Sequence, residues 1–184
     1  EMIPLPSRFT DRAALLAHIR ALTGDSAADM PVPDIAAGGR RAAETALAAI
    51  DPRAYAVSRN HLDGAVTRLS PYIRHGVLSL DEVRNAALAS VGDARQAEKF
   101  IQELAWRDYW QRVYLAHPER IWADVESYKT GFDASEYDPD LPADIAAGET
   151  GVACIDQFVA TLVDTGYLHN HARMYLAAYI VHWR

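Results

Sequence analysis

Two short stretches of this chain carry polar and aromatic side chains at spacings that packing alone does not require. In residues 165–174, a glycine and a tyrosine are followed by two histidines, an asparagine and an arginine within about two helical turns. In residues 103–110, a glutamate, an arginine and two tryptophans recur at helical spacing. Side chains three, four and seven positions apart share one face of a helix. The two stretches therefore predict a site built where helices meet.

The face formed by Glu103, Trp106, Arg107 and Trp110 has two interpretations. In one, Glu103 and Arg107 form an ion pair on the surface of a helix, and both tryptophans pack in the core. In the other, the indole rings form a flat platform beside a carboxylate and a guanidinium group. Such a platform suits a flat heteroaromatic ligand that carries phosphates.

The histidines of the last helix raise the question of a metal. His169 and His171 lie close together, but no carboxylate stands at ligand spacing, and Cys154 is the only cysteine. We therefore expect no metal site and no disulfide. A histidine pair could instead donate protons, since imidazole titrates near neutrality.

A third stretch, residues 67–71, places the hydroxyls of Thr67 and Ser70 just before a helix expected to start at Pro71. A helix N-terminus flanked by hydroxyls is a ready phosphate site. Serine and proline at a helix start are also common as plain capping. The sequence contains no P-loop, no Rossmann glycine fingerprint and no nucleophile elbow.

The elements that must position these stretches are all helical. Apolar residues recur at helical spacing over about residues 13–22, 39–50, 80–90, 93–117, 152–164 and from 170 onward, and no strand or hairpin signal interrupts them. Ser79 and Glu82 form a predicted capping box. We also expect Thr10 or Asp11 to cap the first helix, Gly166 to form a left-handed C-terminal cap and Asn170 to cap the last helix. We expect one all-α domain over residues 1–184, with a connecting loop at 25–38. The apolar helical pattern runs to Arg184 without a stop signal, so we expect the complete domain to be longer.

The charge of the chain is concentrated in one segment. The formal net charge is −7, and residues 123–150 hold eight acidic residues and a single base, Lys129. We interpret this segment as a solvated acidic loop. The rest of the chain is neutral, so overall acidity does not exclude a nucleic-acid face elsewhere. Neither a membrane-spanning run nor a signal peptide is apparent, and we expect a cytoplasmic protein.

The motifs, taken in order, resemble those of a known family. Two of the matching pieces are short: Gly38-Gly39 before an alanine-rich helix, and Tyr55 with Arg59 four residues later. The other four are residues 67–79, residues 100–110, Gly148 with Thr150-Gly151 and Asp156, and residues 165–174. Over residues 38–184 the chain resembles the helical FAD-binding domain of the DNA photolyase/cryptochrome family. The resemblance implies a multi-helix domain that holds a bent FAD.

The resemblance also implies an activity. Repair members of the family, the deoxyribodipyrimidine photo-lyases, flip a UV-damaged pyrimidine dimer out of DNA and over the flavin. Blue light then drives an electron from reduced flavin to the dimer, which splits. Cryptochrome members use similar photochemistry for signalling. The implied partner of a repair member is UV-damaged DNA.

Site residues follow from the resemblance by position. The phosphate and ribityl part of FAD would contact Tyr55, Thr67, Leu69 and Ser70; Arg107 would lie near the cofactor, and Arg173 beside the isoalloxazine. The catalytic set would be Glu103 and Asn170, which hydrogen-bond the lesion bases, and His171, which stands where repair enzymes often keep an arginine that holds DNA. Trp106 would stack on a flipped base, and Met174 would pack in the same cavity.

The chain departs from the family pattern in several places. Val66 replaces a hydroxyl residue expected before Thr67, and no antenna-binding α/β domain precedes the helical region in this sequence. The sequence also lacks the segment that completes the flavin pocket and most of the tryptophan chain that reduces the flavin. Three hypotheses therefore stay open: a light-driven repair enzyme, a cryptochrome-like sensory module that binds flavin without repair, and a helical relative without cofactor.

Overall fold

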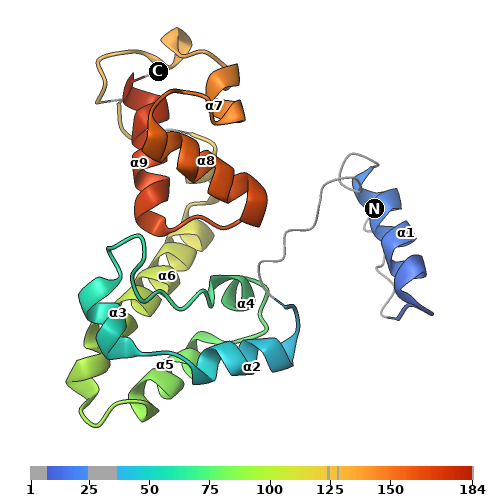
Figure 1. Cartoon of the computed structure of the whole chain (residues 1–184), viewed down its shortest axis with the longest axis vertical. Helices are drawn as coiled ribbons and strands as arrows, with labels where there is room; N and C mark the ends of the chain where they lie inside the picture. The colour runs from blue at the N-terminus through green and yellow to red at the C-terminus, as the bar shows by residue number, and fades with distance from the viewer. Residues whose placement is uncertain (1–7, 25–36, 124, 128, 184) are drawn as a thin grey trace. The chain divides into compact units, whose positions relative to one another are not determined.

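The structure, a computed structural model, describes residues 8–24, 37–123, 125–127 and 129–183. All regular elements in these ranges are helices, which confirms the all-α prediction (Figure 1). The chain divides into two compact units, residues 1–34 and 35–184, which are described separately. Most of the predicted connecting loop, residues 25–36, lies outside the described residues.

The first unit contains α1 (Arg12–Thr23). Asp11 caps it, because its Oδ1 accepts the backbone N–H of Ala14 at 2.8 Å. The apolar residues that predict this helix, Leu15, Leu16, Ile19 and Leu22, are 37–50% exposed.

The second unit contains the remaining elements. In chain order they are α2 (Arg40–Ala48), α3 (Pro52–Ser58), α4 (Ser70–Arg74), α5 (Leu80–Ala89), η2 (Ala94–Ala97), α6 (Glu98–Ala116), η3 (Pro118–Ile121), η4 (Ala134–Glu136), α7 (Ala143–Ala147), α8 (Ala153–Thr165) and α9 (Asn170–Trp183). None of the described helices is long and apolar enough to cross a membrane.

The larger core of this unit, here called the N-terminal cluster, lies among α2 to α6. Its buried side chains come from α2, α4, α5, η2, α6 and the loops between them: Ala43, Leu69, Tyr72, Leu78, Val83, Ala87, Ala97 and Phe100. The capping box predicted for α5 is formed, since Ser79 Oγ accepts the Glu82 N–H and the Glu82 carboxylate accepts the Ser79 N–H at 2.7 Å. Arg40 of α2 also donates a hydrogen bond to Glu82. This bond, followed by those from Ser79, lowers the pKa of Glu82 to about 2.

The smaller core, here called the C-terminal cluster, lies between α8 and α9. It consists of Ile155, Phe158, Leu168 and Ala172. Gly166 ends α8 in the left-handed conformation (φ 61°), as its position in the sequence predicts. The start of α8 is held by Asp156, whose Oδ1 accepts the N–H and the hydroxyl of Thr150 and whose Oδ2 accepts the N–H of Gly151.

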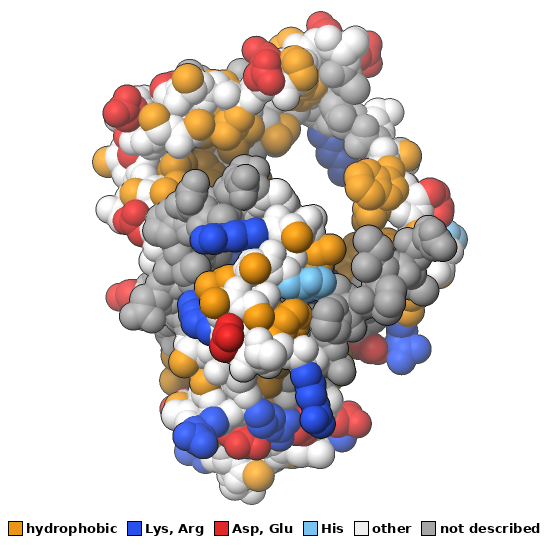
Figure 2. Space-filling model, turned by 90° about the vertical axis from the view of Figure 1, so that its right-hand side faces the viewer, with side chains coloured by type: hydrophobic (Ala, Val, Ile, Leu, Met, Phe, Trp, Pro, Cys, Tyr) orange, Lys and Arg blue, Asp and Glu red, His pale blue; other side chains and the backbone are white. Residues whose placement is uncertain are grey.

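The acidic segment lies between the two clusters in the sequence. It is not loop throughout, because η4 and α7 interrupt it, and Ile145 of α7 is buried. Figure 2 shows acidic side chains at the upper end of the molecule, where these two short helices lie. Most of the described charged side chains in this acidic segment are exposed, in keeping with a solvated segment.

Candidate functional site

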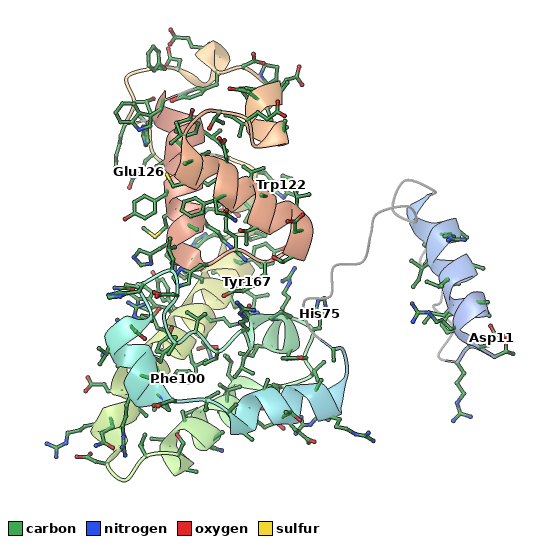
Figure 3. The ribbon with its side chains drawn as sticks, in the orientation of Figure 1. Asp11, His75, Phe100, Trp122, Glu126 and Tyr167 are labelled. Carbon is green, nitrogen blue, oxygen red and sulfur yellow. The ribbon has the colours of Figure 1, made fainter. Side chains whose placement is uncertain are left out.

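A pocket of about 310 Å³ opens where the loop between α8 and α9 and the start of α9 approach α3, α6 and the loop before α4. Figure 3 shows Tyr167 at this junction. Four separate parts of the sequence line the pocket: Tyr55 of α3 with Arg59 at the C-terminal end of that helix, residues 66–70, Glu103 of α6, and residues 167–171 with Arg173. A pocket of this size lies at the lower end of the range for small-molecule sites.

The charge of the pocket is opposite to that of the chain. Three guanidinium groups, from Arg59, Arg68 and Arg173, line it together with one carboxylate, that of Glu103. Hydroxyls of Tyr55, Thr67 and Ser70 stand among them. The lining is therefore rich in hydrogen-bond donors and net positive, as a site for an anion requires.

The single carboxylate is already paired. Glu103 Oε1 lies 3.3 Å from Arg59 Nη2 and 3.0 Å from Lys99 Nζ. In place of the ion pair with Arg107 that one interpretation of the sequence predicts, Glu103 pairs with Arg59 at the end of α3 and with Lys99 of α6. Because Arg59 comes from a different helix, Glu103 joins α3 to α6 at the edge of the pocket.

Tyr167 connects the two sides of the pocket. Its ring lies 5.3 Å from the guanidinium carbon of Arg68 and 5.9 Å from that of Arg173, distances at which cations attract an aromatic ring. Arg173 is held by its Nε, which donates to the Leu168 carbonyl at 2.8 Å. Arg68 has a left-handed backbone (φ 52°), which is uncommon for a residue other than glycine. Such a conformation persists where the surroundings impose it.

His169 has a structural role at the start of α9. Its Nδ1 accepts the backbone N–H of His171 at 3.1 Å, so the imidazole takes the place of a capping side chain. Burial lowers the pKa of His169, and the nearby His171 lowers it further. The backbone of Arg59 has the opposite effect on this pKa, smaller than that of burial. The ring is therefore neutral near pH 7, and its proton sits on Nε2, since Nδ1 is an acceptor. Asn170, expected from the sequence to be the cap, is instead the first residue of the helix.

The other expected cofactor contacts also lie in this pocket. Tyr55 packs edge-on against Phe100, with ring centroids 5.1 Å apart. Burial and the charge of Glu103 raise the pKa of Tyr55, against the effect of Arg59, so its hydroxyl keeps its proton. The Thr67 hydroxyl accepts the Leu69 N–H at 3.3 Å, and Leu69 is 1% exposed. Leu69 thus belongs both to the core and to the pocket wall.

Three predicted site residues do not line this pocket. Trp106 is 53% exposed and stacks on Trp110, which is 60% exposed, at 6.5 Å between centroids. The interpretation that both tryptophans are core residues is therefore wrong. Met174 is exposed, with its sulfur 3.7 Å from the Asn170 amide nitrogen. Arg107 is half-buried, and its Nε has no hydrogen-bond partner in the part of the chain that the structure describes.

Several pocket residues were not predicted. Arg59, Arg68 and Tyr167 were noted only as parts of motifs, and His169 only as one of a histidine pair that could donate protons. Arg68 and His169 stand beside predicted residues in the sequence, but only the packing of the helices and loops shows that all four side chains line one pocket. Among the described residues, no group of three or more His, Cys, Asp or Glu side chains could hold a metal ion.

Comparisons with known proteins match these motifs. The family described as the FAD-binding domain of DNA photolyase matches residues 100–183. The chain is 31% identical over 123 residues to a deoxyribodipyrimidine photo-lyase of Alkalihalophilus pseudofirmus, covering 64% of this chain and 26% of the relative. For the photo-lyase of Streptomyces griseus, the identity is 32% over 125 residues, with 65% and 26% covered. A cryptochrome DASH of Idiomarina loihiensis is 28% identical over 158 residues, with 79% and 34% covered.

A solved structure has the same fold. The crystal structure of a bacterial class III photolyase from Agrobacterium tumefaciens matches with a TM-score of 0.67 and 24% identity, over 86% of this chain and 34% of that one. The chain spans about a quarter of the length of the first two relatives. The matched family, the relatives and the helical fold agree with the motifs and show that this chain belongs to the DNA photolyase/cryptochrome family, in the region of its FAD-binding domain.

Proposed function

We propose that this chain binds FAD through the pocket between α3, α6 and α9, and that it serves the light-driven repair of pyrimidine dimers in DNA. The observation that carries the proposal is the convergence of three guanidinium groups, three hydroxyls and one carboxylate from separate parts of the sequence. The relatives named as deoxyribodipyrimidine photo-lyases support the choice of reaction.

The donor set fits the chemistry of the cofactor. FAD carries phosphates and a ribityl chain, which need cationic and hydroxyl partners. Arg59 and Arg68 provide the charge, and Thr67 and Ser70 provide hydroxyls on the same stretch of the lining. Arg173 would add a positive charge beside the isoalloxazine and favour its anionic reduced form.

The residues around the carboxylate fit a flipped base. When bound and reduced, FAD supplies an electron donor that light can excite. Glu103, as a carboxylate, accepts hydrogen bonds, whereas the Asn170 amide both donates and accepts. Trp106, one helical turn beyond Glu103, is exposed and would be available for stacking, and Met174 lies beside Asn170. His171 would help to hold the strand that carries the lesion.

The first experiment measures the visible absorption spectrum of the purified chain before and after adding FAD. We expect a structured blue flavin band that stays with the protein through gel filtration. Loss of the band with the small molecules would reject flavin binding by this chain, and would favour the hypothesis of a helical relative without cofactor.

A second experiment tests the role of Glu103 in repair. Glu103→Gln keeps the size of the side chain but removes the charge from its hydrogen bonds, which are each worth about 1.5–3 kcal/mol. We expect dimer splitting to fall about ten- to hundredfold, with flavin content unchanged. Glu98→Gln, on the exposed first turn of the same helix, is the matched control and should split dimers like the parent. Equal splitting by Glu103→Gln would remove this role.

A second candidate function has its own support. The match to a cryptochrome DASH, together with His171 where repair enzymes often keep an arginine, favours a flavin-binding sensory module. A chain that retains flavin but neither binds damaged strands nor splits dimers would establish this candidate in place of repair.

A further inference from the structure

We propose that Lys99 is a positioning residue for Glu103: with Arg59 it holds one carboxylate oxygen in place and leaves the other to accept a hydrogen bond from the ligand. This inference rests on the proposed function, because it names how the acceptor of the same site is oriented.

The geometry of the ion pairs is one-sided. Both cations approach Oε1 of Glu103, Arg59 Nη2 at 3.3 Å and Lys99 Nζ at 3.0 Å. For both cations Oε1 is the nearest atom of the carboxylate, and Oε2 accepts no hydrogen bond from the described residues. A carboxylate that is fixed through one oxygen has a defined plane, so its second oxygen is presented in a defined direction.

The two cations restrain Glu103 from different sides. Arg59 comes from α3 and itself lines the pocket, whereas Lys99 stands one turn earlier on the same helix as Glu103 and does not line it. The side chain of Glu103 is 30% exposed, so without the two cations it would have room for several rotamers. Two cations on one oxygen narrow that choice before a ligand arrives, which lowers the entropy lost on binding.

Helix stability does not explain a lysine at this position. Lys99 is the second residue of α6, where the positive end of the helix dipole disfavours a cation. The order lysine then glutamate at i,i+4 is also the weaker of the two orders.

The test is a double-mutant cycle on binding in the dark. We measure the ratio of affinities of the FAD-loaded chain for a strand with a thymine dimer and for the same strand undamaged, in the parent, Lys99→Met, Glu103→Gln and the double variant. We expect Lys99→Met to lower the ratio about fivefold in the parent background and to leave it unchanged in the Glu103→Gln background. Lys99→Arg should restore the ratio.

A control separates positioning from loss of charge. Lys129→Met removes the same charge from the only other lysine of the chain, and should leave the ratio unchanged. An equal effect of Lys99→Met in both Glu103 backgrounds would mean that the lysine acts as a general cation toward DNA, and would overturn the proposal.

A second readout distinguishes this inference from the proposed function. If the parent shows no preference for the damaged strand, the repair proposal fails by itself. The thermal unfolding of the same four proteins, without FAD or DNA, then decides on Lys99. We expect Lys99→Met to lower Tm in the parent background and less so in the Glu103→Gln background. Identical shifts in the two backgrounds would show that Lys99 does not hold Glu103.

Discussion

The two helical clusters on either side of the pocket differ in size and in whether a groove opens onto them: among the described residues, the N-terminal cluster has eight buried members and the C-terminal cluster four. In the N-terminal cluster, Leu69, Leu78 and Val83 are at most 1% exposed. In the C-terminal cluster, Ile155 and Phe158 are 4% and 8% exposed, and both line an open apolar groove of about 460 Å³ between α8 and α9. One cluster is therefore a closed core, whereas the other is a seam between two helices.

The difference determines what holds each wall of the pocket. On one side, Leu69 belongs to the closed core, so apolar packing fixes that wall. On the other side, the start of α9 packs on the smaller C-terminal cluster and is also held by polar contacts: His169 caps the helix, and Arg173 binds the Leu168 carbonyl. We infer that one wall is rigid, and that the other can adjust to a ligand at lower cost.

The largest expected effect is a loss of packing in the closed core. Leu78→Ala should lower the free energy of unfolding by about 4 kcal/mol, because Leu78 is almost fully buried and its neighbours cannot close the cavity. Urea unfolding followed by circular dichroism measures the loss. A value below about 1 kcal/mol would show that this cluster relaxes and is not the rigid wall.

The matched change in the C-terminal cluster should cost less. Ile155→Ala should lower the free energy of unfolding by about 2 kcal/mol, at the low end for such substitutions, because the adjacent groove already gives water access to the site. The same urea measurement applies. If Ile155→Ala cost as much as Leu78→Ala, the contrast between a closed core and a seam would be lost.

Much of the fold follows from local signals in the sequence. The capping box of Ser79 and Glu82 and the glycine at 166 were predicted and are formed, and α1 is capped by Asp11, one of its two predicted caps. Each of these features depends on residues within one turn of chain. The cap of α9 was missed. An imidazole is not among the usual capping side chains, and the sequence offered Asn170 next to it.

The site was predicted less completely, because it depends on contacts between distant residues. Family resemblance identified Glu103 and Thr67 as pocket residues, but not the cations that hold the carboxylate. The helical period suggested Arg107 as the partner of Glu103. The structure pairs it with Arg59 instead, which is 44 positions away and can be found only once α3 is packed on α6.

A smaller, pH-dependent loss of stability is expected when Asp156, which holds the start of α8, is replaced. The Thr150 hydroxyl, aided by the N–H groups of Thr150 and Gly151, lowers the pKa of Asp156 below its usual value. The folded pKa is below the unfolded one, so the stabilisation is present above about pH 4 and is lost as pH falls through the folded pKa.

Asp156→Asn should therefore be less stable than the parent near neutral pH, and the difference should shrink as pH falls below about 4. Thermal unfolding across this range measures both proteins. Asp164→Asn is the control at the other end of α8, where a carboxylate opposes the helix dipole, and should not destabilise. A difference that is constant with pH would contradict a role for the ionised carboxylate.

The smallest expected effect concerns the contact that joins the two clusters. Arg68→Ala removes the cation beside Tyr167 and should lower the free energy of unfolding by about 0.5–1 kcal/mol. It leaves a non-glycine residue in the left-handed backbone, whereas Arg68→Gly relieves that conformation, which costs about 1–2 kcal/mol for other residues.

The glycine variant should therefore be at least as stable as the alanine variant, although glycine gains more entropy on unfolding. In a Tyr167→Leu background, Arg68→Ala should have almost no effect, because the ring that attracts the cation is gone. If the loss persisted in that background, Arg68 would stabilise its own loop only. The adjustable wall would then have to be held against the rigid one by contacts other than this cation and ring.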